Sequence, residues 1–318
     1  MPRSITSSIR KLILTRLTLI WTLLRDAANA WIDDHAASMG AALAYYTLFS
    51  IAPLLLIVIA VAGVVFGEAA ARGEIIAELT GLLGREGAAA VQALLESANR
   101  PAAGALATLF GLAALLIGAT SVFGELQSAL DRIWRAPPRP PAASIADWLH
   151  VRLLSLGMIL AIGFLLIVSL LASAGLAAVQ RWWAPLFSAG PWLAELVEFA
   201  LSFTTITGAF AMLYKLMPRV PVAWRDVWVG ALVTALLFTA GKSVIGGYIG
   251  QSGVASPFGA AGSLVALLIW VYWSAQIFLF GAEFTHVYAL HRLDVFAQRS
   301  AAAACDPSTK SARVPPRH

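Results

Sequence analysis

The sequence is short of charge and nearly devoid of cysteine. Asp, Glu, Lys and Arg together make up 12% of the 318 residues, whereas hydrophobic residues make up 59%. A soluble domain carries roughly a quarter charged residues, so this composition places the chain in the membrane class. Cys305 is the single cysteine, which excludes an internal disulfide framework and a thiolate metal site.

Motifs for enzyme chemistry are also missing. Residues 283–286 have the Glu-x-x-His spacing of carboxylate-bridged di-iron bundles, but the additional copy and glutamates that such a site needs are absent. A Gly-Lys-Ser triplet at 241–243 resembles the end of a phosphate-binding loop, yet Leu236 stands where its first glycine is required. The histidines are not grouped with acidic residues as a hydrolytic metal site requires. We therefore expect no enzyme, no ATPase, no metal and no cofactor.

Long apolar runs dominate what is present. A hydrocarbon core about 30 Å thick needs roughly 20 apolar residues in a helix, which satisfies its own backbone hydrogen bonds in lipid. Six runs reach this length, and Lys242 interrupts the fifth: Met39–Phe66, Gly104–Gly124, Leu153–Val179, Leu196–Tyr214, Val227–Ile249 and Ala261–Ala282. The sequence therefore predicts an all-α integral membrane bundle of six transmembrane helices.

Three segments lie outside these spans. Residues 1–36 hold a short apolar run between Arg16 and Arg25, which is typical of an amphipathic helix lying in the membrane interface. Within the membrane domain, 37–292, residues 67–103 have apolar side chains at helical spacing, which predicts two short amphipathic helices on the outer face. Residues 293–318 are polar and basic, and we expect a disordered tail there.

Basic residues are distributed unevenly between alternate connections. The connections on the side of both termini hold 17 Lys and Arg residues, and the opposite connections hold four. The positive-inside rule therefore predicts that both termini are cytoplasmic. The formal net charge of +5 follows the same rule, so we expect no nucleic-acid partner.

Three charged residues lie in or beside the spans. They are Glu125, Lys242 and Glu283. Charged groups at this depth are expensive, and they usually face the bundle interior or water. The alternative is that both glutamates reach water at the inner headgroups and that Lys242 extends its long stem outward.

The inner half of the first span carries a polar stripe. It contains Tyr45, Tyr46 and Ser50, followed by Pro53, which bends or loosens a helix. One interpretation is that these side chains line a polar seam that opens to the cytoplasm. The other is that the tyrosines anchor the helix at the interface and the serine bonds to its own backbone.

The sixth span offers a matching face. Gln276, Glu283 and His286 share one side of a helix because they are spaced by seven and three residues. If this side points inward, it meets the polar stripe of the first span at a similar depth. In the fifth span, Gly246 and Gly250 have the spacing of close helix contacts. We interpret them as packing residues within the bundle, with assembly of a homo-oligomer as the alternative.

Several segments together are similar to one family of bacterial inner-membrane proteins. They read AALAYYTLFSIAPLLLIVIA, GATSVFGELQSALDRIWR, PVAWRDVWVGALVTALLFTAGK and GAAGSLVALLIWVYWSAQIFLFGAEFTHVY. The chain resembles the YihY/BrkB family over roughly residues 25–295. This resemblance implies six transmembrane helices in the inner membrane with both ends cytoplasmic. Family members carry a virulence label and a ribonuclease label, and we judge the second wrong because these residues hold no nuclease chemistry.

The function that these features favour is transport. Some members of the resembled family are linked to export of lipopolysaccharide precursors. We expect a transporter or flippase-like exporter of an amphipathic or lipid-linked substrate, with membrane lipids as partners. The alternatives are a non-catalytic envelope scaffold or binding protein and, third, a membrane enzyme. The residues expected to line the substrate path are Tyr45, Tyr46, Ser50, Pro53, Glu125, Lys242, Gln276, Glu283 and His286.

Overall fold

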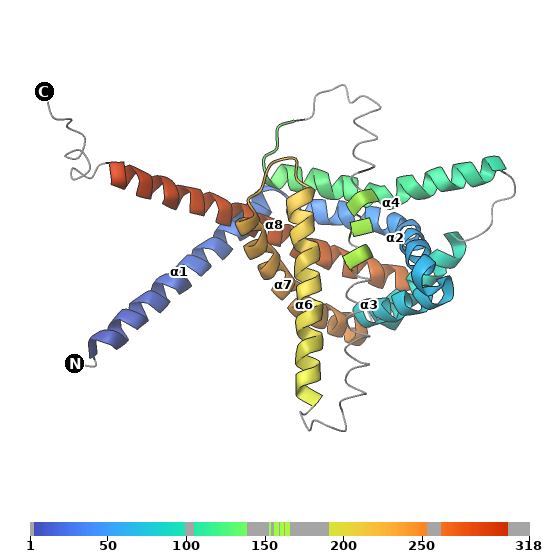
Figure 1. Ribbon diagram of the computed structural model, residues 1–318, viewed down its shortest axis with the longest axis horizontal. Helices are drawn as coiled ribbons and strands as arrows, with labels where there is room; N and C mark the ends of the chain where they lie inside the picture. The colour runs from blue at the N-terminus through green and yellow to red at the C-terminus, as the bar shows by residue number, and fades with distance from the viewer. Residues whose placement is uncertain are drawn as a thin grey trace, which may run out of the picture.

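Long helices build the protein, as the computed structural model in Figure 1 shows. The structure describes residues 3–98, 105–138, 191–252 and 262–304 and parts of 153–165, and these residues contain no β-strand. The helices are α1 (Arg3–Asp33), α2 (Ala36–Phe66), α3 (Glu68–Ala98), α4 (Ala105–Ile133), α6 (Pro191–Leu216), α7 (Trp224–Ser252) and α8 (Gly262–Ala304). The all-α class is therefore confirmed.

Among the described residues, four helices are long and apolar enough to cross a membrane. The qualifying stretches are Ala36–Val64 in α2, Phe199–Leu216 in α6, Trp224–Ile245 in α7 and Leu264–Asp294 in α8. They correspond to the first, fourth, fifth and sixth expected spans. The second expected span falls in α4, which is not among the four stretches, and most of the third lies outside the described residues. The count of six spans stays a prediction.

Helix α8 lies at the centre of the bundle and packs against α1, α2, α3, α4 and α7. The main core is formed where α2, α4, α6, α7 and α8 meet, and it includes Leu43, Leu130 and Leu279. Tyr214 of α6 is fully buried there, and its hydroxyl donates a 2.8 Å hydrogen bond to the Phe278 carbonyl of α8. This bond satisfies the buried Tyr214 hydroxyl, which would otherwise be an unpaired polar group in an apolar interior.

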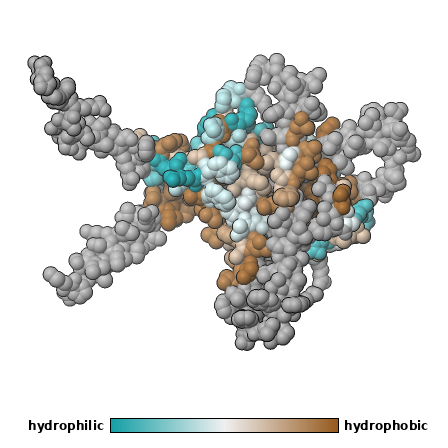
Figure 2. All heavy atoms as spheres, in the orientation of Figure 1, coloured by the Kyte–Doolittle hydropathy of each residue, from teal (hydrophilic) through white to brown (hydrophobic). Residues whose placement is uncertain are grey.

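Helix α1 and the end of α8 project from the same side of the bundle (Figure 1). The last part of α1 is nonetheless packed, because Leu23 and Ala27 are buried against Phe284 of α8. Hydrophilic residues gather where α8 leaves the bundle, whereas apolar residues cover much of the remaining described face (Figure 2). Helix α8 continues to Ala304, so helix occupies part of the segment that was expected to be a disordered tail. The interfacial position of residues 1–36 stays a prediction.

Helix α3 folds back on itself at the other end of the bundle. Ile76 and Gln92 line one cavity of about 340 Å³, although a straight helix would hold them about 24 Å apart. Helix α3 must therefore bend between these two residues. Both arms contribute to one core cluster with Ile59 of α2 and Leu267 of α8. The expected pair of short amphipathic helices is thus a single, bent helical segment.

Candidate functional site

Glu283 is the most deeply buried charged residue among the described residues. Its exposed fraction is 0%, and it lies inside the apolar stretch Leu264–Asp294 of α8. Neither carboxylate oxygen has a hydrogen-bond partner within the described part of the chain. Its electrostatic neighbours are Asp34 and Arg135. A carboxyl group in this position would be very costly as an isolated charge.

Asp34 occupies the corner between α1 and α2. Its side chain is 6% exposed, and its Oδ1 accepts a 2.6 Å hydrogen bond from Nη1 of Arg135, which follows α4. Its second oxygen, Oδ2, has no partner within the described residues. The ion pair therefore joins the α1–α2 corner to the end of α4 and leaves Asp34 Oδ2 available to interact with Glu283.

The backbone on both sides of this ion pair is in a left-handed conformation. His35 has a φ of 57° and Arg135 a φ of 51°, and they are the non-glycine residues with positive φ in the described part of the chain. Ala136 donates to the Asp131 carbonyl and Arg135 to the Arg132 carbonyl, the pattern of a Schellman cap. Glycine usually occupies that position, because an L-residue there costs roughly 1–2 kcal/mol. Arg135 occupies this position, and its side chain reaches Asp34.

His286 lies one turn after Glu283 on α8. Its ring centroid is 5.1 Å from that of Trp134, and its electrostatic neighbours are again Arg135 and Asp34. The indole nitrogen of Trp134 is buried without a partner in the described residues. We call the group formed by Asp34, Arg135, Glu283 and His286 the acidic corner. It contains two carboxyl groups and one guanidinium, so its carboxylates are not fully balanced by fixed positive charge.

Close contacts between α7 and α8 fix the position of Glu283. A Cβ added to Gly230 would overlap Thr285, and a Cβ added to Gly281 would overlap Thr234. Each threonine hydroxyl donates to the carbonyl of the glycine one turn earlier on its own helix, at 2.7 Å for Thr234 and 2.6 Å for Thr285. Both helices thus use a Gly-x-x-x-Thr pair, and Glu283 lies between the two members of the α8 pair.

Gln276 connects the same face of α8 to the start of α2. Its Nε2 donates to the Ala37 carbonyl at 3.4 Å, and its amide packs against Gly40, where a Cβ would collide with it. Gln276 and Glu283 are both buried, so the face that carries them points into the bundle. His286 is half-buried at the end of this face.

The polar stripe of α2 is divided between the inside and the outside of the bundle. Ser50 is buried, and its hydroxyl has no partner within the described residues. Tyr45 is 59% exposed and packs on the ring of Phe49 with centroids 4.9 Å apart, and Tyr46 is 39% exposed. The structure therefore does not bring the tyrosines into the acidic corner. Their place in a substrate path stays a prediction.

Pro53, Glu125 and Lys242 lie apart from the acidic corner. Helix α2 continues through Pro53, where Gly118 of α4 approaches so closely that an added Cβ would be 3.1 Å from Pro53 Cγ. Glu125 and Lys242 are both half-buried, and no ion pair within the described residues involves either of them. Their proposed roles in a path stay predictions.

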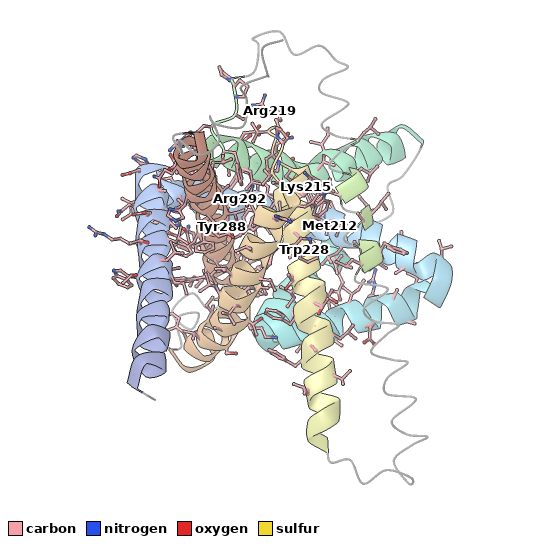
Figure 3. The ribbon with its side chains drawn as sticks, turned by 60° about the vertical axis from the view of Figure 1, so that its left-hand side comes forward. Met212, Lys215, Arg219, Trp228, Tyr288 and Arg292 are labelled. Carbon is pink, nitrogen blue, oxygen red and sulfur yellow. The ribbon has the colours of Figure 1, made fainter. Side chains whose placement is uncertain are left out.

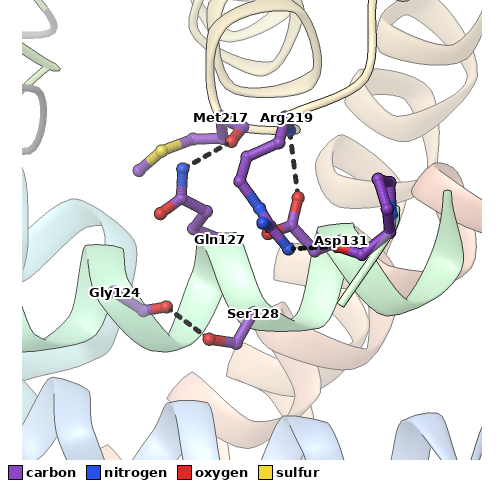
Figure 4. Close-up of polar contacts among 7 residues, drawn as sticks. Gly124, Gln127, Ser128, Asp131, Met217 and Arg219 are labelled. Carbon is purple, nitrogen blue, oxygen red and sulfur yellow. Dashed lines mark hydrogen bonds and ion pairs between the residues drawn. The ribbon is translucent and has the colours of Figure 1, made fainter. Parts of the chain in front are cut away.

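Among the described residues, two ion pairs outside the acidic corner join different segments of the bundle, and they were not expected from the sequence. Arg219, after α6, donates from Nε to Asp131 of α4 at 2.5 Å, and Gln127 donates to the Met217 carbonyl at 3.1 Å (Figure 4). Arg292 of α8 donates to Asp226 of α7 at 2.9 Å. Figure 3 shows Arg219 at the end of the bundle where α6 finishes. The only sequence signal for these pairs is an aspartate at a helix end.

The acidic corner lies within a segment shared with known proteins. A family model described as "Virulence factor BrkB" matches residues 27–305. The chain belongs to this family. The resemblance noted from the sequence is thereby confirmed, and all four residues of the acidic corner lie inside the matched range.

Curated relatives of the chain are named as membrane proteins. A UPF0761 membrane protein of Klebsiella pneumoniae is 35% identical over 180 residues, which cover 56% of this chain and 59% of the relative. UPF0761 membrane protein YihY of Escherichia coli O139:H28 is 34% identical, with 56% and 58% covered. The chain thus spans less than two thirds of the length of these relatives. No solved structure matches the chain.

Proposed function

We propose that this multi-pass membrane protein is a flippase-like transporter of an amphipathic or lipid-linked substrate. It acts in the bacterial inner membrane with both termini in the cytoplasm. The observation that carries this proposal is the buried Glu283 carboxyl, which has no hydrogen-bond partner among the described residues inside a membrane span. Ionisable groups in membrane spans are expensive, so retained ones mark substrate, ion or proton pathways by default.

The position of the acidic corner supports a moving part at this site. Asp34, Arg135 and Glu283 come from the α1–α2 corner, the end of α4 and α8. A change of charge at one of them alters the attraction between all three elements, because two carboxyl groups compete for one guanidinium. Transport by alternating access requires such a change in how packed helices hold together.

The exposed apolar surface of α7 is consistent with an amphipathic substrate. Large apolar side chains are exposed along α7, including Leu236 at 63% and Val244 at 71%. In a bilayer these side chains face lipid, so a substrate with an acyl portion can reach the helices from within the membrane. Trp224 and Trp228 are exposed, and the Nζ of Lys215 lies 5.4 Å from the Trp224 ring centroid. Such a group suits the headgroup level of the bilayer.

A scaffold or binding protein of the envelope is the second candidate. The tight Gly-x-x-x-Thr contacts between α7 and α8 favour it, because they describe a rigid helix pair. In that case Glu283 serves only to hold α8 in place, and its replacement alters stability without altering any flux.

Lipid movement in proteoliposomes tests the proposal. Fluorescent phospholipid and lipopolysaccharide-precursor analogues are supplied to vesicles that hold the native protein, Glu283→Gln or Glu74→Gln. Glu74 is an exposed glutamate of α3 and provides the matched control. We expect the native and Glu74→Gln proteins to accelerate movement of the analogues across the bilayer. Glu283→Gln should move them at least tenfold more slowly than the native protein. Native flux equal to that of empty vesicles would refute the flippase proposal.

A further inference from the structure

We infer that Asp34 and Glu283 form a proton-binding site in which the two carboxyl groups share one proton. This site does not depend on the proposed function, because it follows from burial, from charge and from the contact between the Asp34 and Glu283 side chains. Asp34 is 6% exposed and Glu283 is 0% exposed, and three of their four carboxylate oxygens have no hydrogen-bond partner within the described residues. The fourth oxygen accepts the Arg135 guanidinium.

A bound proton would neutralise the excess negative charge of the Asp34 and Glu283 carboxyl groups. Two ionised carboxyl groups beside one guanidinium would leave one negative charge buried in the bundle. One added proton removes that charge, and the resulting carboxylic acid can donate to the neighbouring carboxylate. Paired carboxyl groups in close contact cannot both ionise, and they hold one proton between them. No group of three or more metal-ligating side chains occurs in the part of the chain that the structure describes.

Other charged groups near α8 do not replace this proton. His286 is the remaining titratable group of the acidic corner, but its ring packs on Trp134 and no ion pair within the described residues includes it. Asp226 of α7 is already paired with Arg292. A proton on the carboxyl pair therefore gives the balance that no fixed cation supplies among the described residues.

The proton also holds helices together. With the proton in place, Asp34 and Glu283 attract each other across the junction of the α1–α2 corner with α8. When the proton leaves, two like charges face each other, the guanidinium is bonded to Asp34 alone, and the junction is weakened. The acidic corner thus links proton occupancy to the contact between these elements.

Infrared difference spectroscopy of the full-length protein in lipid nanodiscs tests this inference. Protonated carboxyl groups give a carbonyl stretching band that shifts in heavy water. We expect such a band at neutral pH in the native protein and in Glu74→Gln, and its loss in Glu283→Gln. Asp34→Asn should shift the band, because the acceptor of the shared proton changes. Native and Glu283→Gln spectra that are the same in this region would overturn the inference.

Folding controls show whether a lost infrared band reflects the loss of the proton site or the unfolding of a variant. Circular dichroism and size-exclusion chromatography establish that each variant is folded, and Gln preserves the shape of Glu. If Glu283→Gln does not fold, the native protein still decides the matter. A native spectrum without any protonated carboxyl band at neutral pH contradicts the shared proton. Because no substrate is present, failure of this test is distinct from failure of the transport proposal.

Discussion

A methyl group added at Gly281 is expected to force α7 and α8 apart. A Cβ at this position overlaps the Thr234 hydroxyl and lies 2.6 Å from the Tyr214 hydroxyl. These two hydroxyl oxygens lie 2.9 Å apart in the core, where the Tyr214 hydroxyl donates to the Phe278 carbonyl and the Thr234 hydroxyl to the Gly230 carbonyl. Overpacking costs roughly 1–3 kcal/mol and a lost buried hydrogen bond about 1 kcal/mol. We therefore expect Gly281→Ala to lower the free energy of unfolding by about 2–4 kcal/mol.

Gly124 of α4 provides the control for this change. It is also helical, but an added Cβ there meets nothing within 4 Å. Because alanine is favoured over glycine in a helix by roughly 1 kcal/mol, Gly124→Ala should be neutral or stabilising. Reversible unfolding in mixed detergent and dodecyl sulfate micelles, followed by circular dichroism, measures both variants.

A double-mutant cycle locates the cause of the loss. Thr234→Ala removes the hydroxyl that an added methyl group at Gly281 would meet. Residues in direct contact show interaction energies of about 0.5–3 kcal/mol, so Thr234→Ala should be less harmful in the Gly281→Ala background than alone. If Gly281→Ala is as stable as Gly124→Ala, or if the two changes simply add, the close contact of α7 with α8 is wrong.

Three other predictions concern the acidic corner, α3 and the orientation of the chain. Arg135→Gln should destabilise the protein by about 1 kcal/mol, because Asp34 is buried and loses its hydrogen bond while the Arg135 side chain is 61% exposed to solvent, and Asp34→Asn should restore part of this stability. Equal losses with and without Asp34→Asn in chemical unfolding would contradict the ion pair. With Cys305 replaced by serine, Ile76→Cys and Gln92→Cys should be joined by a short bifunctional thiol reagent, and no intramolecular product would mean that α3 is straight. In the native protein, Cys305 should react with an impermeant maleimide in inverted vesicles, which expose the cytoplasmic face, and not in intact spheroplasts. Labelling in intact spheroplasts would contradict the predicted orientation.

Apolar length and helical periodicity predicted much of the architecture. The runs around α2, α6, α7 and α8 were recognised because a membrane span needs about 20 apolar residues, whatever its partners are. The shared face of Gln276 and Glu283 was recognised for a similar reason, since positions seven apart on a helix point the same way. Both features are local, and both are visible in one stretch of sequence.

Features that depend on tertiary contacts were missed. Asp34 and Arg135 are 101 residues apart, and nothing in either segment indicates the other. The Gly-x-x-x-Thr spacing of α7 and α8 can be read from the sequence, but so can the glycine spacing at 246–250. Spacing alone does not show which of these positions contacts another helix. Tyr45 is 59% exposed although Ser50 is buried, because residues five apart on a helix point to different sides; Tyr46, four residues before Ser50, is less exposed at 39%.

The central claim is that the buried Glu283 carboxyl is functional rather than structural. Lipid-analogue movement by native protein, Glu283→Gln and Glu74→Gln in the same proteoliposomes, at equal amounts of folded protein, tests it most directly. We expect Glu283→Gln to remain folded and to move the analogues at least tenfold more slowly than the native protein, whereas Glu74→Gln should keep the native rate. Folded Glu283→Gln that moves lipid at the native rate would contradict the claim.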